Sequence, residues 1–128
     1  MSSGGFFDRA VMNIEAFRKY CLHKPGVTEA FPFDESVLVF KVGGKMFALT
    51  DVDTFESVNL KCDPERAIEL RERYEAVRPG YHMNKKHWNT LVMDGSLPDT
   101  FLRAEIDASY ALVAARMPKS KKLRIGIK

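Results

Sequence analysis

Apolar and polar positions recur along this chain with two different periods, and each period predicts a type of secondary structure. Apolar residues spaced three or four apart predict three helices, each with one buried face. Each helix begins at a favourable residue: Asn13 and Asp63 can cap a helix, and Pro98 suits a first helical position. The predicted helices lie near residues 13–23, 64–75 and 98–117.

Alternation with a period of two predicts strands between and after these helices. The predicted strands span residues 27–33, 37–42, 45–50, 57–62 and 87–93. Gly43 and Gly44 give the strongest hairpin signal, because glycine tolerates the positive φ angles of a tight two-residue turn. In the strand at 57–62, Val58, Leu60 and Cys62 point to the same side, so Cys62 is expected to be a packed core thiol.

The order of these elements is a helix, a run of antiparallel strands, a helix, one or two strands and a last helix. That order predicts the α+β class, with an antiparallel sheet of five to six strands and three main helices packed on one face. One domain is expected over residues 12–118. Residues 1–11 contain Ser-Ser-Gly-Gly and are expected to be a flexible leader or a cloning remnant, and residues 119–128 a basic C-terminal tail.

Composition is ordinary for a globular protein, with 45% hydrophobic and 29% charged residues among 128. No run approaches the roughly 18–20 apolar residues of a membrane span, and the first residues lack the features of a signal peptide. The two cysteines do not make a disulfide framework. A cytoplasmic protein with reduced thiols and no membrane partner is therefore expected.

The net charge of +3 hides an uneven distribution along the chain. Residues 1–115 carry 17 acidic and 14 basic side chains, whereas residues 116–128 carry six basic side chains and no acidic one. A basic end of this kind could attract nucleic acid or another anionic surface. The alternative is a solvated end that only aids solubility.

The candidate chemistry gathers in residues 79–90, Pro-Gly-Tyr-His-Met-Asn-Lys-Lys-His-Trp-Asn-Thr. This stretch holds two of the three histidines, the single tryptophan, two lysines and two asparagines, and no acidic residue. Buried polar groups need partners, so such a concentration of donors and aromatic rings favours a contact surface over a core strand. The candidate nucleic-acid-binding residues are Tyr81, His82, Asn84, Lys85, Lys86, His87 and Asn89.

Two interpretations of this stretch follow from the residues alone. In the first, Lys85 and Lys86 neutralise phosphates, the asparagines bond to phosphates or base edges, and Tyr81 and Trp88 offer rings for stacking. In the second, Trp88 packs into the core, Asn84 caps a turn and the lysines form an ordinary solvated corner. Strand alternation favours a core position for Trp88, because it places Trp88 on one side and both neighbours on the other.

Neither catalytic nor metal-binding residues can be identified. The chain contains no GxSxG, Walker, HExxH, CxxC or dinucleotide-binding motif, so no enzymatic activity and no cofactor are expected. His82 and His87 fall short of the three or four ligands of a zinc site.

Five segments together resemble the signature of the MmcQ/YjbR family of small bacterial proteins: residues 79–90, Phe31-Pro32-Phe33, residues 39–48, residues 60–65 and residues 94–98. The likeness covers Met12 to about Lys119. It implies a CyaY-like (frataxin-like) fold and a DNA-binding protein that acts through two β-hairpin wings.

Other functions were also considered. Frataxin-like iron binding would require an acidic first helix, whereas this one sets Glu15 against Arg18 and Lys19. A protein-binding module like the secretion chaperones would be one alternative. A pocket for a small anionic ligand, built from Tyr81, His82, Asn84 and His87, would be another. The sequence thus indicates a bacterial, non-enzymatic DNA-binding module that is expected to be a monomer, with weak dimerisation as the alternative.

Overall fold

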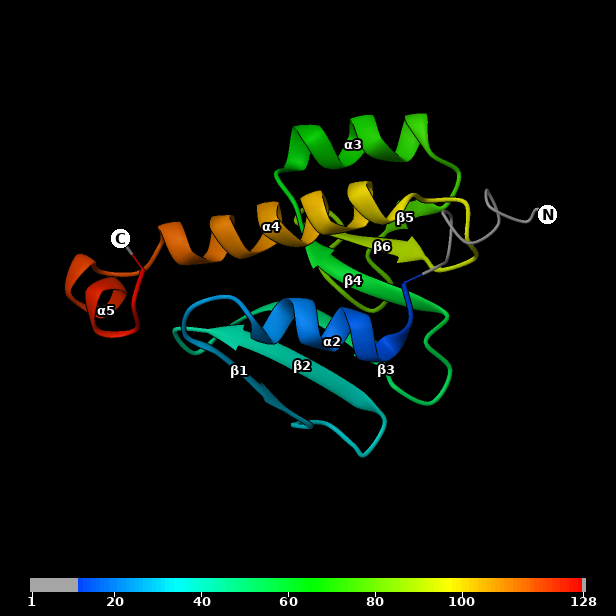
Figure 1. Ribbon diagram of the computed structural model, residues 1–128. Coiled ribbons are helices and arrows are strands. Elements are labelled where there is room, and N and C mark those ends of the chain that lie inside the picture. The colour runs from blue at the N-terminus through cyan, green and yellow to red at the C-terminus, as the bar shows by residue number, and fades with distance from the viewer. Residues whose placement is uncertain (1–11, 128) are drawn as a thin grey trace.

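Six antiparallel strands form the centre of the computed structural model, which describes residues 12–127 (Figure 1). The strands are β1 (Val27–Ala30), β2 (Val37–Val42), β3 (Lys45–Asp51), β4 (Ser57–Lys61), β5 (Val77–Pro79) and β6 (Trp88–Val92). They lie in the order β1-β2-β3-β4-β6-β5, with every neighbouring pair antiparallel. The predicted α+β class and antiparallel sheet are confirmed.

The helices are α2 (Ile14–Leu22), α3 (Pro64–Arg73), α4 (Asp99–Ala115) and α5 (Lys119–Arg124). The first three match the predicted helices. Asn13 caps α2 by accepting a 2.8 Å bond from the Ala16 amide, and Asp63 caps α3 in the same way with Arg66. Within residues 12–127, no helix combines the length and the apolar character that crossing a membrane requires.

The main core lies between the sheet and the helices α2, α3 and α4. Its largest side chains include Phe17 on α2, Phe40 and Phe47 on the strands, and Ile106 on α4. The Phe17 and Phe40 rings meet edge to face with centroids 5.7 Å apart. Cys62 is buried in this core, as predicted from the alternation of its strand.

A smaller cluster lies on the opposite face of the sheet. Val39, Leu49 and Trp88 form its buried part, and Met83 is among the side chains that pack against them. No residue of a described helix contributes to this cluster. The strand register explains it, because β2, β3 and β6 each direct alternate residues away from the helices.

Strand β5 was not predicted and forms one of the two edges of the sheet. It has three residues, too few to show a period, and its last residue is Pro79. A proline suits an edge strand because it lacks the N–H that a second neighbour would need.

The C-terminal residues also differ from the expectation, since residues 119–124 of the expected tail form α5. Lys121 donates from Nζ to the Gly43 carbonyl over 2.9 Å. Ile125 packs so closely on Gly26 that a Cβ there would lie 2.6 Å from Ile125 Cδ1. These contacts dock α5 onto the end of the sheet. The predicted leader, residues 1–11, lies outside the described residues.

Candidate nucleic-acid interface

The stretch that the sequence singled out forms a loop, residues 80–87, which joins β5 to β6 at one end of the sheet. The Gly80 amide donates to the Trp88 carbonyl over 2.9 Å, and the Trp88 amide donates to the Asn84 carbonyl over 3.0 Å. A Cβ on Gly80 would lie 2.7 Å from Trp88 Cβ, so only glycine fits where the loop closes.

Most candidate residues of this loop face solvent. Tyr81 is 70% exposed, His82, Lys85 and Lys86 are exposed, and His87 is half-buried. The Tyr81 and His82 rings lie together, with centroids 4.1 Å apart. This outer part of the loop therefore offers two cationic side chains and an aromatic pair to a ligand.

Asn84 is exposed and also shapes the loop. Its Oδ1 accepts a 2.9 Å bond from the Lys86 amide, which is the turn-capping role considered for it from the sequence. Its amide group stays accessible to solvent. Asn84 can therefore hold the loop and still contact a ligand.

Asn89 has a different role from the expected one. Its side chain is 1% exposed, and its Oδ1 accepts a 2.7 Å bond from Nε of Arg71 on α3. Arg71 also donates from Nη2 to the carbonyls of Lys85 and Trp88. The expectation that Asn89 contacts a ligand is corrected, because this side chain is enclosed between α3 and β6.

Arg71 is the positioning residue that sequence reasoning missed. It is one of several charged residues on α3, and no local pattern distinguishes it from Arg73 or Glu72. Only the packing of α3 beside β6 shows that its guanidinium holds the loop through two main-chain carbonyls.

Trp88 occupies the buried position that strand alternation favoured. It is 7% exposed and packs with Val39 and Leu49 on the face of the sheet opposite the helices. Its ring is not available for stacking on a base, so the exposed rings of residues 79–90 are those of Tyr81 and His82.

A second turn lies at the same end of the sheet as the loop 80–87. Gly43 and Gly44 join β2 to β3 with φ angles of +60° and +82°, which confirms the predicted hairpin. Strand β4 runs antiparallel to both β3 and β6, so its last residue, Lys61, ends between the two turns. The register pairs Lys61 with Trp88, the first residue after the loop.

The surroundings of Lys61 are electropositive. Partial burial lowers the pKa of its ammonium, and repulsion from Arg116 and Lys45 lowers it further. The ion pairs formed within residues 12–127 involve other cations, namely Arg18, Lys24 and Arg66. Lys61, Lys45 and Arg116 thus form no ion pair in the described part of the chain.

The topology gathers many of the charged residues that lie in connections and at element ends at two opposite ends of the sheet. The end with the two turns and α5, called the basic end below, carries Lys41, Lys45, Lys61, Lys85, Lys86, Arg116, Lys119, Lys121, Lys122 and Arg124. The connections at the opposite end, called the acidic end, carry Asp34, Glu35, Asp51, Asp53, Glu56, Glu75, Asp94 and Asp99. Asp63 and Glu65 are the acids that lie at the start of α3 near the basic end.

The interior offers little reactive chemistry near this end. Burial is the main cause that raises the pKa of the Cys62 thiol, which disfavours the nucleophilic thiolate. Among residues 12–127, no three His, Cys, Asp or Glu side chains lie together in a way that could hold a metal ion.

Comparison with known proteins identifies the family. The YjbR family model matches residues 22–112. The uncharacterized protein YjbR of Escherichia coli (strain K12) is 38% identical over 112 residues, covering 87% of this chain and 95% of that protein. The uncharacterized protein YbdF of Escherichia coli O157:H7 is 34% identical over 112 residues, which is 87% of this chain and 92% of YbdF.

Solved structures show the same fold. The crystal structure of Deinococcus radiodurans protein DR2400 superposes with a TM-score of 0.86 at 38% identity, covering 92% of this chain and 91% of that one. A Pseudomonas syringae protein superposes with a TM-score of 0.69 at 27% identity, covering 80% of this chain and 99% of its own. From the matched residues, the shared length and the common fold, this chain belongs to the YjbR family.

Proposed function

We propose that this protein is a cytoplasmic, non-enzymatic DNA-binding module that contacts the phosphate backbone with its basic end. The observation that carries the proposal is the separation of charge, which gathers cations from the β2–β3 turn, β4, the loop 80–87 and α5 at one end. A field of this kind would steer a polyanion toward the basic end and keep it away from the acidic end.

The spacing of the two turns supports contact with duplex DNA. Strands β3, β4 and β6 separate them, so the turns lie about 14 Å apart if neighbouring strands are ~4.8 Å apart. This is comparable with the ~12 Å width of the major groove of B-DNA. Lys45 on one turn and Lys85 with Lys86 on the other would contact phosphates on either side of a groove, with Lys61 between them.

Repulsion within the basic end supports the same proposal. The pKa of Lys61 is lowered by partial burial first, and then by repulsion from Arg116 and Lys45, so these two cations act on the Lys61 ammonium. Phosphates would relieve this repulsion. Tyr81 would add a ring beside the backbone, and the arrangement predicts binding with little sequence preference because phosphate contacts carry no sequence information.

The test is a titration of a labelled duplex by fluorescence anisotropy at two salt concentrations. We expect a Kd tighter than ~100 μM at low salt and a steep loss of affinity with added salt. Replacing Lys85 and Lys86 together by alanine should weaken binding to all sequences alike. It should also flatten the plot of log K against log salt by about 0.9 for each phosphate that the variant no longer neutralises.

Arg73→Ala with Arg78→Ala is the matched control, because it removes two exposed charges from the part of the protein near the acidic end. This control should bind as the wild type does. An equal loss of affinity in both double variants, or no binding by the wild type at low salt, would reject DNA binding through the basic end.

A further inference from the structure

A hollow of about 630 Å³ lies between α2 and α4, on the helical side of the domain. We call it the α2–α4 groove, and its lining comes from Ala16, Lys19, Tyr20, His23, Lys24, Pro25 and Arg103. Its volume falls within the roughly 300–1,000 Å³ of small-molecule sites. Four of the seven lining residues are Lys, Arg or His, and none is acidic.

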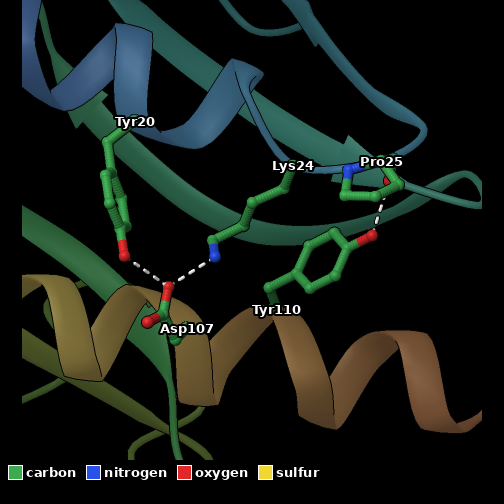
Figure 2. Close-up of polar contacts among 5 residues, drawn as sticks. All are labelled: Tyr20, Lys24, Pro25, Asp107 and Tyr110. Atoms are coloured by element: carbon green, nitrogen blue, oxygen red, sulfur yellow. Dashed lines mark hydrogen bonds and ion pairs between the residues drawn. The ribbon is translucent and has the colours of Figure 1, made fainter.

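A bonded cluster holds the floor of this groove in place (Figure 2). The carboxylate of Asp107 on α4 accepts a 2.8 Å hydrogen bond from the Tyr20 hydroxyl and forms an ion pair with Lys24 Nζ. The Lys24 ammonium also lies 5.0 Å from the centroid of the Tyr20 ring and 5.3 Å from that of Tyr110. The negative charge of Asp107 is therefore already neutralised inside the cluster.

The Tyr20 hydroxyl is a stable part of this floor. Burial is the main cause that raises its pKa, and the bond to Asp107 raises the pKa further. The hydroxyl thus keeps its proton and continues to donate to the carboxylate. On the other side of the cluster, Tyr110 donates to the Pro25 carbonyl over 2.5 Å, which fixes the end of α2 against α4.

Two further cations, Lys19 and Arg103, line the groove and form no ion pair in the described chain. The guanidinium carbon of Arg103 is 5.7 Å from the Tyr20 ring centroid, and the ion pairs within residues 12–127 include neither Arg103 nor Lys19. A guanidinium is planar by resonance, and its N–H donors match the two oxygens of a carboxylate or phosphate; the contact with the Tyr20 ring restricts its orientation. The groove therefore presents positive charge beside an apolar wall.

We propose that the α2–α4 groove binds a small organic anion, a carboxylate or a phosphate ester carried on a flat apolar body. Arg103 and Lys19 bind the anionic group, and the apolar body lies against Tyr20 and Pro25. The charge complementarity of the groove and its volume select this class of ligand over a neutral one. The lining residues of the groove are different from the cations of the basic end, although Pro25 adjoins Gly26, on which Ile125 packs. The proposal therefore does not rest on DNA binding.

The experiment is a titration of the full chain with phenyl phosphate, followed by amide chemical shifts in NMR. The expected result is saturable shifts confined to residues around the groove, such as Tyr20 and Arg103. Inorganic phosphate lacks the apolar body and benzyl alcohol lacks the charge, so each should bind at least about tenfold more weakly than phenyl phosphate. Shifts centred on the loop 80–87, or equal binding of all three compounds, would overturn the proposal.

Arg103→Glu tests the anion contact, with Arg73→Glu as a matched control. Both arginines are exposed, lie on a helix and rest on a tyrosine ring. The guanidinium carbon of Arg73 is 5.4 Å from the centroid of the Tyr74 ring. Arg103→Glu should weaken phenyl phosphate binding at least about tenfold, whereas Arg73→Glu should leave it unchanged. Arg103→Lys, which keeps the charge and loses the planar fork, should give an intermediate affinity. Wild-type affinity in Arg103→Glu would reject the groove as the site.

Discussion

Arg71 on α3 and Asn89 on β6 form a partly buried side-chain hydrogen bond of 2.7 Å that connects the helical layer to the loop at the basic end. The amide of Asn89 also reaches back to the Ala67 carbonyl, at 3.5 Å. The same guanidinium donates to two carbonyls of the chain around that loop. The conformation of the proposed DNA-binding loop thus depends on a helix that is not itself part of the basic end.

Replacing Asn89 by alanine should destabilise the protein by roughly 1–3 kcal/mol, because the partly buried guanidinium of Arg71 loses its acceptor. Urea denaturation measures this change in the free energy of unfolding. Asn84→Ala is the control, since Asn84 is exposed and its side chain accepts one bond within the loop. An equal loss of unfolding free energy in the two variants would mean that the hydrogen bond to Arg71 contributes no more to stability than the bond of an exposed side chain.

Lys61→Gln should make the isolated protein slightly more stable and its DNA binding weaker. The pKa of Lys61 is lowered in the folded state, so folding disfavours the charged ammonium, and this cost is present at neutral pH and vanishes above the unfolded value of 10.5. The gain should be within about 0.5 kcal/mol, or 1–3 °C in Tm by calorimetry.

Added salt should shrink that gain in Tm, because it screens the repulsion from Arg116 and Lys45. Lys86→Gln serves as the comparison: it removes an exposed charge of the same loop region and should lower DNA affinity without a comparable rise in Tm. A lower Tm for Lys61→Gln would show that the Lys61 side chain stabilises the fold.

The two glycines of the β2–β3 turn should respond differently to alanine. Gly44 has φ +82° and open space within 4 Å of the point where a Cβ would stand, so Gly44→Ala should cost about 1–2 kcal/mol from backbone strain alone. Gly43 has φ +60°, and its Cβ would lie 2.0 Å from Met117 Sδ. Gly43→Ala should therefore cost about 1–3 kcal/mol more than Gly44→Ala.

Measuring both glycine variants in a Met117→Ala background separates the cost of backbone strain from the cost of the overlap with the Met117 side chain. In that background the two glycine variants should cost nearly the same, because the sulfur that meets the new methyl group is gone. Chemical denaturation of the single and double variants measures the coupling. An unchanged difference would show that Met117 moves aside without cost.

Stability should fall at alkaline pH partly through Cys21. Burial raises the pKa of this fully buried thiol from 9.0 to about 12. The unfolded chain therefore ionises first, and stability that is complete below pH ~9 is lost as pH rises toward ~12, by roughly 2 kcal/mol at pH ~10.5. Urea denaturation near pH 8 and pH 10.5 should show a smaller loss in Cys21→Ala than in the wild type. Equal losses would mean that the folded state ionises Cys21 as readily as the unfolded chain does.

The local elements of this protein follow from its sequence. Period and end signals predicted α2, α3 and α4 and five of the six strands, because each element must direct its apolar residues to one side. The glycine pair predicted the β2–β3 turn, and strand alternation placed Cys62 and Trp88 in buried positions. The candidate residues of the loop 80–87 were chosen from a dense run of donors and rings, and the structure places them in exposed or half-buried positions.

The tertiary structure decided which of these residues meet. In the sequence Asn89 is one of several polar residues, but in the structure it is bonded to Arg71 of α3. The expected C-terminal tail forms a helix that is docked through contacts with Gly26 and Gly43. The basic end likewise exists only because antiparallel strand order brings Lys45, Lys61 and the loop 80–87 to one end of the sheet. Sequence periods report which side of an element is buried, but contacts between distant elements depend on packing, which no local pattern encodes.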